Sequence, residues 1–339
     1  MQTVITKSKL SNARKERQKA DVESETRIKS ARAADPDVLA GTPYRSLSRL
    51  GDGFQGEVYE AEHRELKTLV AVKIAPAGAA PVQRLRAEGM LLASVNHPHL
   101  PRVIDMGYTA GGRLYVAMDL IRGETLMVRL KRLERDNWVI VTDVAIRWTR
   151  QLLGALSALH RRGIVHGDVK PSNILVLQDG NTVALLDLGA AVPMEPDSLA
   201  ASLAGPPRAV KVCTTRYAAP EVLIEEFPSA QEDIYSTGLV LYEMLAGRDV
   251  YGSIPDNERA KKVHDCFYPA PLPDLNSSAA AVWPIVSKAI KKYPSERYES
   301  AEEFSEELRK LEMEMWKARE LGRHGDSCHV ARSEVHNDP

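Results

Sequence analysis

One short segment constrains this chain more than any other: His-Gly-Asp-Val-Lys-Pro-Ser-Asn at residues 166–173. It places a carboxylate (Asp168), an ammonium (Lys170) and an amide (Asn173) on one loop, and the apolar residues 174–177 that follow predict a strand. A second carboxylate, Asp187, comes after another short apolar run. Because carboxylate and amide oxygens suit hard cations, the pattern predicts a strand hairpin with a magnesium-type site.

These side-chain types are the ones that phosphoryl transfer requires. A carboxylate can orient an attacking hydroxyl and accept its proton, a lysine can offset charge on the moving group, and an amide oxygen can bind magnesium. A solvated turn is the plain alternative, but it does not account for a carboxylate, a lysine and an amide together on one short loop. Asp168, Lys170, Asn173 and Asp187 are therefore the first candidate site residues.

The bulk composition is that of a globular protein. The 339 residues carry a net charge of -1, which gives no basic excess for a general nucleic-acid binder. No apolar run approaches the roughly 20 residues of a membrane span. Cys213, Cys266 and Cys328 lie far apart and cannot all pair, which favours a reducing compartment, the cytoplasm.

The hydrophobic pattern predicts two unequal lobes of an α+β fold. Residues 44–120 are strand-like, with β-rich runs at 69–74 and 113–118 around a helical stretch at 82–95. From residue 121 the spacing is helical, as at 144–160 and 234–245. We expect a small β-rich lobe over 41–120 and a larger helical lobe over 121–315.

The two ends of the chain differ from this pattern. Residues 1–40 are charged and poor in large apolar groups, which predicts a disordered arm, with a basic docking or targeting segment as the alternative. Apolar spacing predicts a last amphipathic helix from Ala301 to about Ala318. Residues 316–339 are then the end of that helix and a loose tail.

Two further features suit a nucleotide. Gly51, Gly53 and Gly56 lie between strand-like runs, and glycines let a backbone approach phosphate oxygens, although a glycine-rich hairpin alone would look the same. Lys73 ends the run 70–73 and could hold phosphates. Glu88, between core-facing leucines on the predicted helix, is its candidate partner; a solvated helix carboxylate is the alternative.

Taken in order, these motifs resemble a eukaryotic-type Ser/Thr protein kinase of the sort found in bacteria, over about residues 44–313. The resemblance implies a bilobal protein-kinase-like fold that binds ATP with Mg²⁺, or with Mn²⁺ as second candidate. It implies that Asp168 is the base, that Lys170, Lys73 and Glu88 assist it, and that Asn173 and Asp187 hold the metal. The nucleotide-contacting set that it implies is Gly51, Asp52, Gly53, Phe54, Gly56, Val58, Ala71, Lys73, Met118, Asp119, Ile121 and Leu175.

Later motifs extend the resemblance. Ala-Pro-Glu at 219–221 would close an activation segment, and Thr214 falls where the family places a threonine bonded to the base. Residues 233–238 resemble the buried helix that anchors the catalytic loop. Arg297 resembles the arginine that pairs with Glu221 in a structural role.

The chain departs from the family pattern at Gly167, which replaces an arginine, and at Ala190 and Ala191, where a further basic residue is common. A phosphate on the activation segment would lack its arginine partner, so we expect activity without such phosphorylation. Ser172 replaces a glutamate of some basophilic members, so no arginine-directed specificity is inferred.

Two other functions stay open. His-Gly-Asp with an asparagine five residues after the aspartate also occurs in aminoglycoside and choline phosphotransferases, which modify small molecules. A pseudokinase scaffold is the third interpretation. The lysine and proline at 170–171, the motif at 219–221 and Arg297 favour a protein substrate, which can include the chain itself.

The resemblance adds expectations about partners. These are a protein substrate and ATP, with no nucleic acid and no membrane span, and with a homodimer or docking through residues 1–40 as candidates. Delivery into another cell's cytoplasm is the alternative location that the basic start suggests.

Overall fold

The computed structural model describes residues 38–53, 56–136, 138–195, 198–204, 216–224, 229–248, 272 and 277–330. The chain divides into two compact units. The first, called the sheet unit, comprises residues up to Leu85 together with Ile104–Leu120. The second, called the helical unit, comprises Arg86–Val103 and everything from Ile121 onward.

The sheet unit is built on a five-stranded sheet of order β1-β2-β3-β5-β4. Its strands are β1 (Tyr44–Gly53), β2 (Gly56–His63), β3 (Leu69–Ile74), β4 (Val103–Tyr108) and β5 (Leu114–Asp119). Alternate side chains of these strands form one core that includes Tyr44, Val72 and Tyr115. The predicted strand at 69–74 is confirmed, and the one at 113–118 is shifted by one residue.

The sheet unit begins before residue 41, where the predicted arm ends. Leu39 is fully buried in the sheet-unit core, and the Ala110 amide donates a hydrogen bond to the Ala40 carbonyl over 2.7 Å. The apolar run from Val38 to Ala40 is too short to give a periodic signal, so the burial of Leu39 could not be predicted from spacing. Residues 1–37, which carry the rest of the arm, lie outside the described part of the chain.

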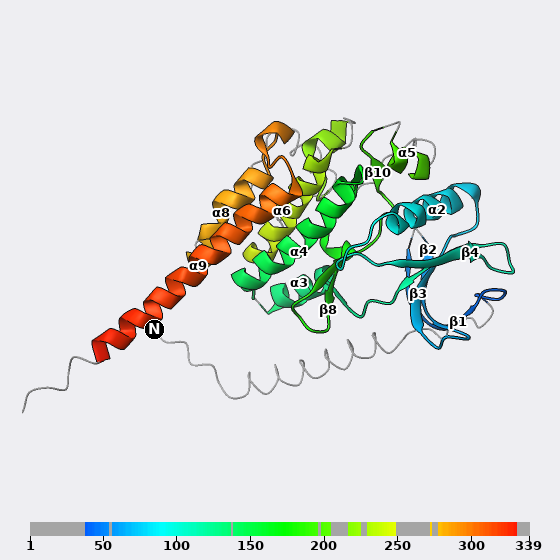
Figure 1. Cartoon of the computed structure of the whole chain (residues 1–339), viewed down its shortest axis with the longest axis horizontal. Coiled ribbons are helices and arrows are strands. Elements are labelled where there is room, and N and C mark those ends of the chain that lie inside the picture. Colours follow the sequence, from blue (N-terminus) through cyan, green and yellow to red (C-terminus); the bar gives the residue numbers. More distant parts are fainter. Residues whose placement is uncertain are drawn as a thin grey trace, which may run out of the picture. The chain divides into compact units, whose positions relative to one another are not determined.

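The helical unit is layered around two long helices, α4 and α6, which pack against each other (Figure 1). Its helices are α3 (Leu126–Arg135), α4 (Thr142–His160), α5 (Leu199–Ala204), α6 (Ala230–Ala246), α8 (Ser277–Ala289) and α9 (Ala301–Val330), with α2 (Ala79–Ala93) crossing the division between the units. Its strands are β6 (Gly123–Thr125), β7 (Ile164–Val165), β8 (Ile174–Leu177), β9 (Val183–Leu185) and β10 (Val192–Pro193), and its 3-10 turns are η1 (Pro171–Asn173), η2 (Pro220–Ile224) and η3 (Pro294–Glu296).

Helix α6 is the buried axis of this unit. Every residue from Glu232 to Ala246 is buried, and the helix ends at Gly247, whose φ of 66° is left-handed. Since a helix that is apolar nearly all round must be covered on every side, α6 is enclosed by its neighbours. Its few polar residues, Asp233 and Ser236 among them, therefore hold their partners in fixed positions.

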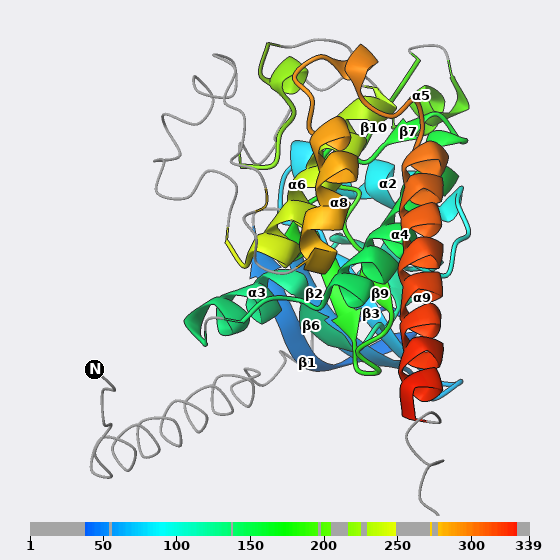
Figure 2. The ribbon, with the colours of Figure 1, turned by 90° about the vertical axis from the view of Figure 1, so that its left-hand side faces the viewer.

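Two boundaries differ from the sequence expectation. Residues 86–103 belong by their contacts to the helical unit, because Leu91, Leu92 and Leu100 join its core. Helix α9 continues to Val330, so the end expected near Ala318 is wrong. Figure 2 shows α9 lying along α4, where Arg319 forms an ion pair with Asp143. Apolar spacing marks only the packed turns of a helix, and the last turns carry no such spacing.

Among the described helices, none combines the length and the apolar composition that crossing a bilayer requires.

Candidate active site

The predicted reacting residues meet on one loop between β7 and β8. Lys170 Nζ lies 2.6 Å from Asp168 Oδ2. The Asn173 side-chain amide donates to the same carboxylate oxygen over 3.1 Å and to the Asp168 carbonyl over 2.9 Å. The side chains of Asp168 and Lys170 are 9% and 20% exposed. The loop therefore holds an ammonium and an amide against one carboxylate, with limited access to solvent.

The candidate metal ligands lie at the same end of a strand hairpin. Strands β8 and β9 pair with Ile174 opposite Leu185, and the Leu186 amide donates to the Asn173 carbonyl over 2.8 Å. Asp187 follows directly, with a positive φ of 67°, and its Oδ1 accepts from the Gly189 amide over 2.9 Å. A left-handed non-glycine residue is uncommon and marks a position that its surroundings hold in place.

This donor set fits a hard cation. With the Asn173 amide nitrogen turned toward Asp168, its oxygen is left as a donor atom, and Asp187 follows the strand β9 that pairs with β8 directly after Asn173. The described residues contain no cluster of three or more His, Cys, Asp or Glu side chains that could hold a metal. A metal held by one amide and one carboxylate oxygen would complete its shell with water or phosphate, as Mg²⁺ does.

Asp233 on the buried helix α6 anchors the loop that carries Asp168. Its Oδ2 accepts from the His166 amide and from His160 Nε2, each over 2.8 Å, and its Oδ1 accepts from the Gly167 amide over 2.9 Å. Burial opposes ionisation of this carboxyl, but the hydrogen bonds from His160 and Gly167, with the nearby imidazoles, hold its pKa below the usual range. Asp233 is therefore a charged support for the loop at neutral pH.

His166 closes the same network from within the loop. It is fully buried, its Nδ1 accepts from the Asp168 amide over 3.3 Å, and its Nε2 donates to the Leu186 carbonyl over 3.2 Å. This pair of bonds joins the loop to the hairpin that carries Asp187.

Gly167 takes a conformation that suits glycine. Its φ is +74°, and a Cβ atom there would come 3.0 Å from the Ala190 carbonyl oxygen and 3.5 Å from Glu232 Oε1. Since left-handed backbone is costly for residues with a Cβ, glycine lets this turn form without strain. The departure from the family pattern is thus compatible with a well-formed loop.

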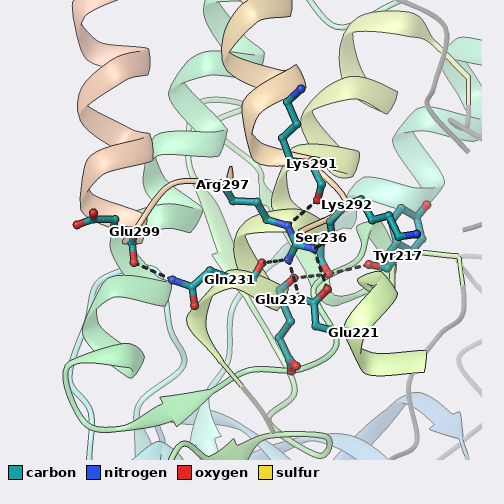
Figure 3. Close-up of polar contacts among 9 residues, drawn as sticks. All are labelled: Tyr217, Glu221, Gln231, Glu232, Ser236, Lys291, Lys292, Arg297 and Glu299. Atoms are coloured by element: carbon teal, nitrogen blue, oxygen red, sulfur yellow. Dashed lines mark hydrogen bonds and ion pairs between the residues drawn. The ribbon is translucent and has the colours of Figure 1, made fainter. Parts of the chain in front are cut away.

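A second buried network is centred on Arg297 and Glu221 (Figure 3). Arg297 donates two hydrogen bonds to the Glu221 carboxylate over 2.6 and 2.7 Å, which confirms the predicted pair. The same guanidinium donates to the carbonyls of Lys291, Gln231 and Lys292 over 2.8, 2.8 and 2.9 Å. The pair ties the start of η2 to α6 and to the turn before α9.

Most of the remaining predicted nucleotide residues lie in the sheet unit. Lys73 is 7% exposed on β3, paired in register with Val58 on β2 and with Val116 on β5. Ala71 lies opposite Met118, and Asp119 ends β5.

The glycine-rich turn is formed by the ends of β1 and β2. Gly51 pairs with Val58, and Asp52 and Gly53 complete β1. At Gly56, with a φ of +133°, a Cβ would come 2.4 Å from the Ile74 carbonyl oxygen, so only glycine fits. Phe54 lies outside the described residues, as does Thr214.

The helical unit holds Ile121, Leu175 and Glu88. Leu175 is buried on β8, opposite Ala184 of β9, and Glu88 is 5% exposed on α2. The proposed pair of Glu88 with Lys73 joins residues of different units and stays a prediction.

The sequence reasoning missed His160. It ends α4, is six residues before His166, and donates to Asp233 Oδ2, the same oxygen that accepts from the His166 amide. A histidine closing an apolar helix just before a charged loop was the available signal, but such residues are ordinary at helix ends.

Comparison with known proteins agrees with this geometry. The protein kinase domain family matches residues 44–327, so the chain belongs to the protein kinase family. Among its relatives are the serine/threonine-protein kinase pkn2 of Myxococcus xanthus, 32% identical over 81% of this chain and 33% of that protein. Another is serine/threonine-protein kinase PknH of Mycobacterium bovis, 31% identical over 76% of this chain and 42% of that protein.

A solved structure shares the fold. The PknI kinase domain of Mycobacterium tuberculosis matches with a TM-score of 0.61 at 23% identity, covering 82% of this chain and 100% of that one. The chain spans about 33 to 53% of the length of the first three curated relatives that it matches, pkn2 among them.

Proposed function

We propose that the chain transfers the γ-phosphate of ATP to Ser or Thr hydroxyls of protein substrates. The observation that carries the proposal is the contact of Asp168 with both Lys170 and Asn173 on a loop anchored by Asp233. Asp168 orients the substrate hydroxyl and accepts its proton, and Lys170 offsets charge as the phosphoryl group moves. Catalysis of this kind is mainly positioning and charge stabilisation.

The metal would be Mg²⁺, with Mn²⁺ as a substitute, held by Asn173 and Asp187. It would supply charge neutralisation at the phosphates of ATP. On the protein side, Lys73 would hold the α- and β-phosphates and be fixed by Glu88, and the turn that contains Gly56 would cover the phosphates. Met118, Asp119 and Ile121 would contact the adenine.

The protein would act in a reducing cytoplasm. Three cysteines spread over 116 positions, from Cys213 to Cys328, support a compartment without disulfide formation. The chain itself, through autophosphorylation, is one candidate substrate. A homodimer and docking through residues 1–40 belong to the same proposal.

The test is transfer of radiolabelled phosphate from Mg-ATP by wild type and Asp168→Asn. Each enzyme is offered a basic protein, an acidic protein and, separately, kanamycin and choline. Label on a protein at Ser or Thr that disappears in the variant is the expected result. Label on kanamycin or choline alone would make the chain a small-molecule phosphotransferase. ATP binding with no transfer to any acceptor would favour a scaffold role.

A further inference from the structure

Helix α9 has two faces that carry different residues. On one face Phe304 and Leu308 are fully buried, and Met315 packs against the same core of the helical unit. The other face leaves two large apolar side chains exposed, Met313 by 44% and Trp316 by 58%. Because they are three positions apart on a helix, they lie next to each other. Two neighbouring large apolar residues exposed on one helix face indicate a surface that another molecule covers.

This exposed face points away from the other helices of the unit. At 3.6 residues per turn, Met313 and Trp316 lie about 110° around the helix from the buried Leu308. Glu312 and Arg319 form ion pairs with α4, and both lie on the Leu308 side of α9. The last turns of α9 also project past α4 and α8 (Figure 1). The face is therefore accessible to a second helix.

The apolar pair lies between two opposite charges. Arg309 is four residues before Met313, and Glu320 is four residues after Trp316, so all four side chains form one line on α9, called the outer stripe. Arg309 binds Glu306 through Nε and Nη2, each over 2.7 Å. A guanidinium has a further terminal nitrogen, which can donate to a second carboxylate. The outer stripe thus has a positive end, an apolar centre and a negative end.

This order of charges is complementary to itself when it is reversed. In two antiparallel copies with Met313 facing Trp316, the equal spacings place Arg309 opposite Glu320 at both ends, as a two-fold axis requires. The thioether and the indole then meet in a favourable sulfur–aromatic contact. A parallel pair would instead bring like charges together at both ends, which is unfavourable. A second copy of the chain is therefore the partner that the outer stripe fits.

We propose that two copies of the chain associate through the outer stripes of their α9 helices, packed antiparallel. The inference rests on the homodimer included in the proposed function and gives that dimer a surface, and it does not require phosphate transfer. The outer stripe is about 17 Å long, so the interface is small and the association weak. We expect a monomer at about 1 µM and a large share of dimer at about 100 µM.

The experiment is sedimentation velocity of the full chain over roughly this range of concentrations. The average mass of the wild type should rise toward that of a dimer. Trp316→Glu places a charge at the apolar centre and should stay monomeric throughout. Arg309→Glu and Glu320→Arg each set like charges against one another at both ends of the stripe. Each should therefore raise the dissociation constant by about tenfold or more.

A mixture of two variants tests the register. When Arg309→Glu and Glu320→Arg are combined in equal amounts, every contact in the mixed pair again joins an acidic and a basic side chain. The mixture should therefore dimerise about as well as the wild type. Arg132→Glu on α3 is the matched control, because Arg132 is 50% exposed and paired with a glutamate, as Arg309 is at 48%. It should dimerise as the wild type does.

The inference is overturned if the wild type stays monomeric, if the single variants dimerise as well as the wild type, or if the mixture is no better than its components. A monomeric wild type in which Trp316→Glu changes the hydrogen exchange of residues 1–37 would assign the face to the arm, which also overturns it. Transfer of labelled phosphate is measured on the same samples. Transfer by a monomer leaves the proposed reaction standing, and a dimer without transfer leaves this inference standing.

Discussion

The reacting loop and the Arg297 network are both polar clusters in one unit, but they use their hydrogen-bonding groups differently. Arg297 is 0% exposed, and all five of its N–H donors are used: two on Glu221 and three on backbone carbonyls. Its guanidinium also lies over the Tyr235 ring, 4.7 Å from the centroid. Asp168, in contrast, keeps part of its carboxylate accessible.

The difference separates support from chemistry. A side chain whose donors are all occupied cannot bind a new partner, but it fixes the segments around it. Its removal therefore lowers the free energy of unfolding. A group that must bind a substrate hydroxyl needs spare capacity, and it contributes less to stability. Substitutions in the two clusters should therefore have opposite profiles of activity and stability.

The largest effect is expected at the reacting loop. Asp168→Asn should lower turnover by about 10² to 10⁴-fold, because the amide cannot accept the hydroxyl proton. Its free energy of unfolding should change by less than about 1 kcal/mol, since asparagine keeps the shape of the side chain and its oxygen can still accept a hydrogen bond from Lys170. ATP binding should be nearly unchanged, whereas Lys73→Met or Asp187→Asn should weaken it. Transfer assays, denaturant titration and nucleotide titration measure the three quantities.

The assignment of roles at the loop is wrong if all three variants lose ATP binding equally. It is also wrong if Asp168→Asn retains turnover.

The next effect is expected at the buried network. Arg297→Ala leaves the Glu221 charge buried without its partner and removes the donors of three carbonyls. We expect a loss of about 3 to 5 kcal/mol in the free energy of unfolding, measured by denaturant titration. Arg309→Ala is the matched control, because this exposed arginine pairs with Glu306 one turn away on α9. Arg309→Ala should leave the midpoint of the denaturant titration unchanged.

Equal shifts in Arg297→Ala and Arg309→Ala would mean that the buried network does not support the unit. The comparison between the two clusters would then fail.

The smallest effect is expected on the activation segment. Substituting Ser198, Ser202 and Thr215 together by alanine should leave the transfer rate within about twofold of wild type, because Gly167 supplies no arginine for a phosphate. The Ser198 hydroxyl donates to the Glu195 carbonyl over 2.7 Å and accepts from the Ala201 amide over 3.1 Å, so Ser198→Ala alone serves as the structural control. Thr215 lies outside the described residues.

Initial transfer rates before and after phosphatase treatment also test whether activity requires phosphorylation of the activation segment. A collapse of the rate in the triple variant, but not in Ser198→Ala, would show that phosphorylation of this segment is required.

Much of the site was predictable because its parts are close in sequence. Asp168, Lys170 and Asn173 share one loop, and Asp187 follows on the next strand, so local spacing alone brings their residue types together. The resemblance to protein kinases then predicted the more distant pair of Arg297 and Glu221, which are 76 positions apart. The family comparison supports the same fold.

Other features needed packing information. The burial of Leu39, the continuation of α9 to Val330 and the part played by His160 depend on neighbours far along the chain. Leu39 and the last turns of α9 have no periodic signal, and a histidine at a helix end, as at His160, is too ordinary to be singled out.

The sequence by itself determined the chemical groups of the site, their order and the strand hairpin that presents them, because those depend on local conformation and residue type. Only the tertiary structure decided what supports the loop. Asp233 accepts from the His166 amide across 67 positions and from His160 across 73. Such contacts are set by how α4 and α6 pack, and packing depends on the shapes of many side chains at once.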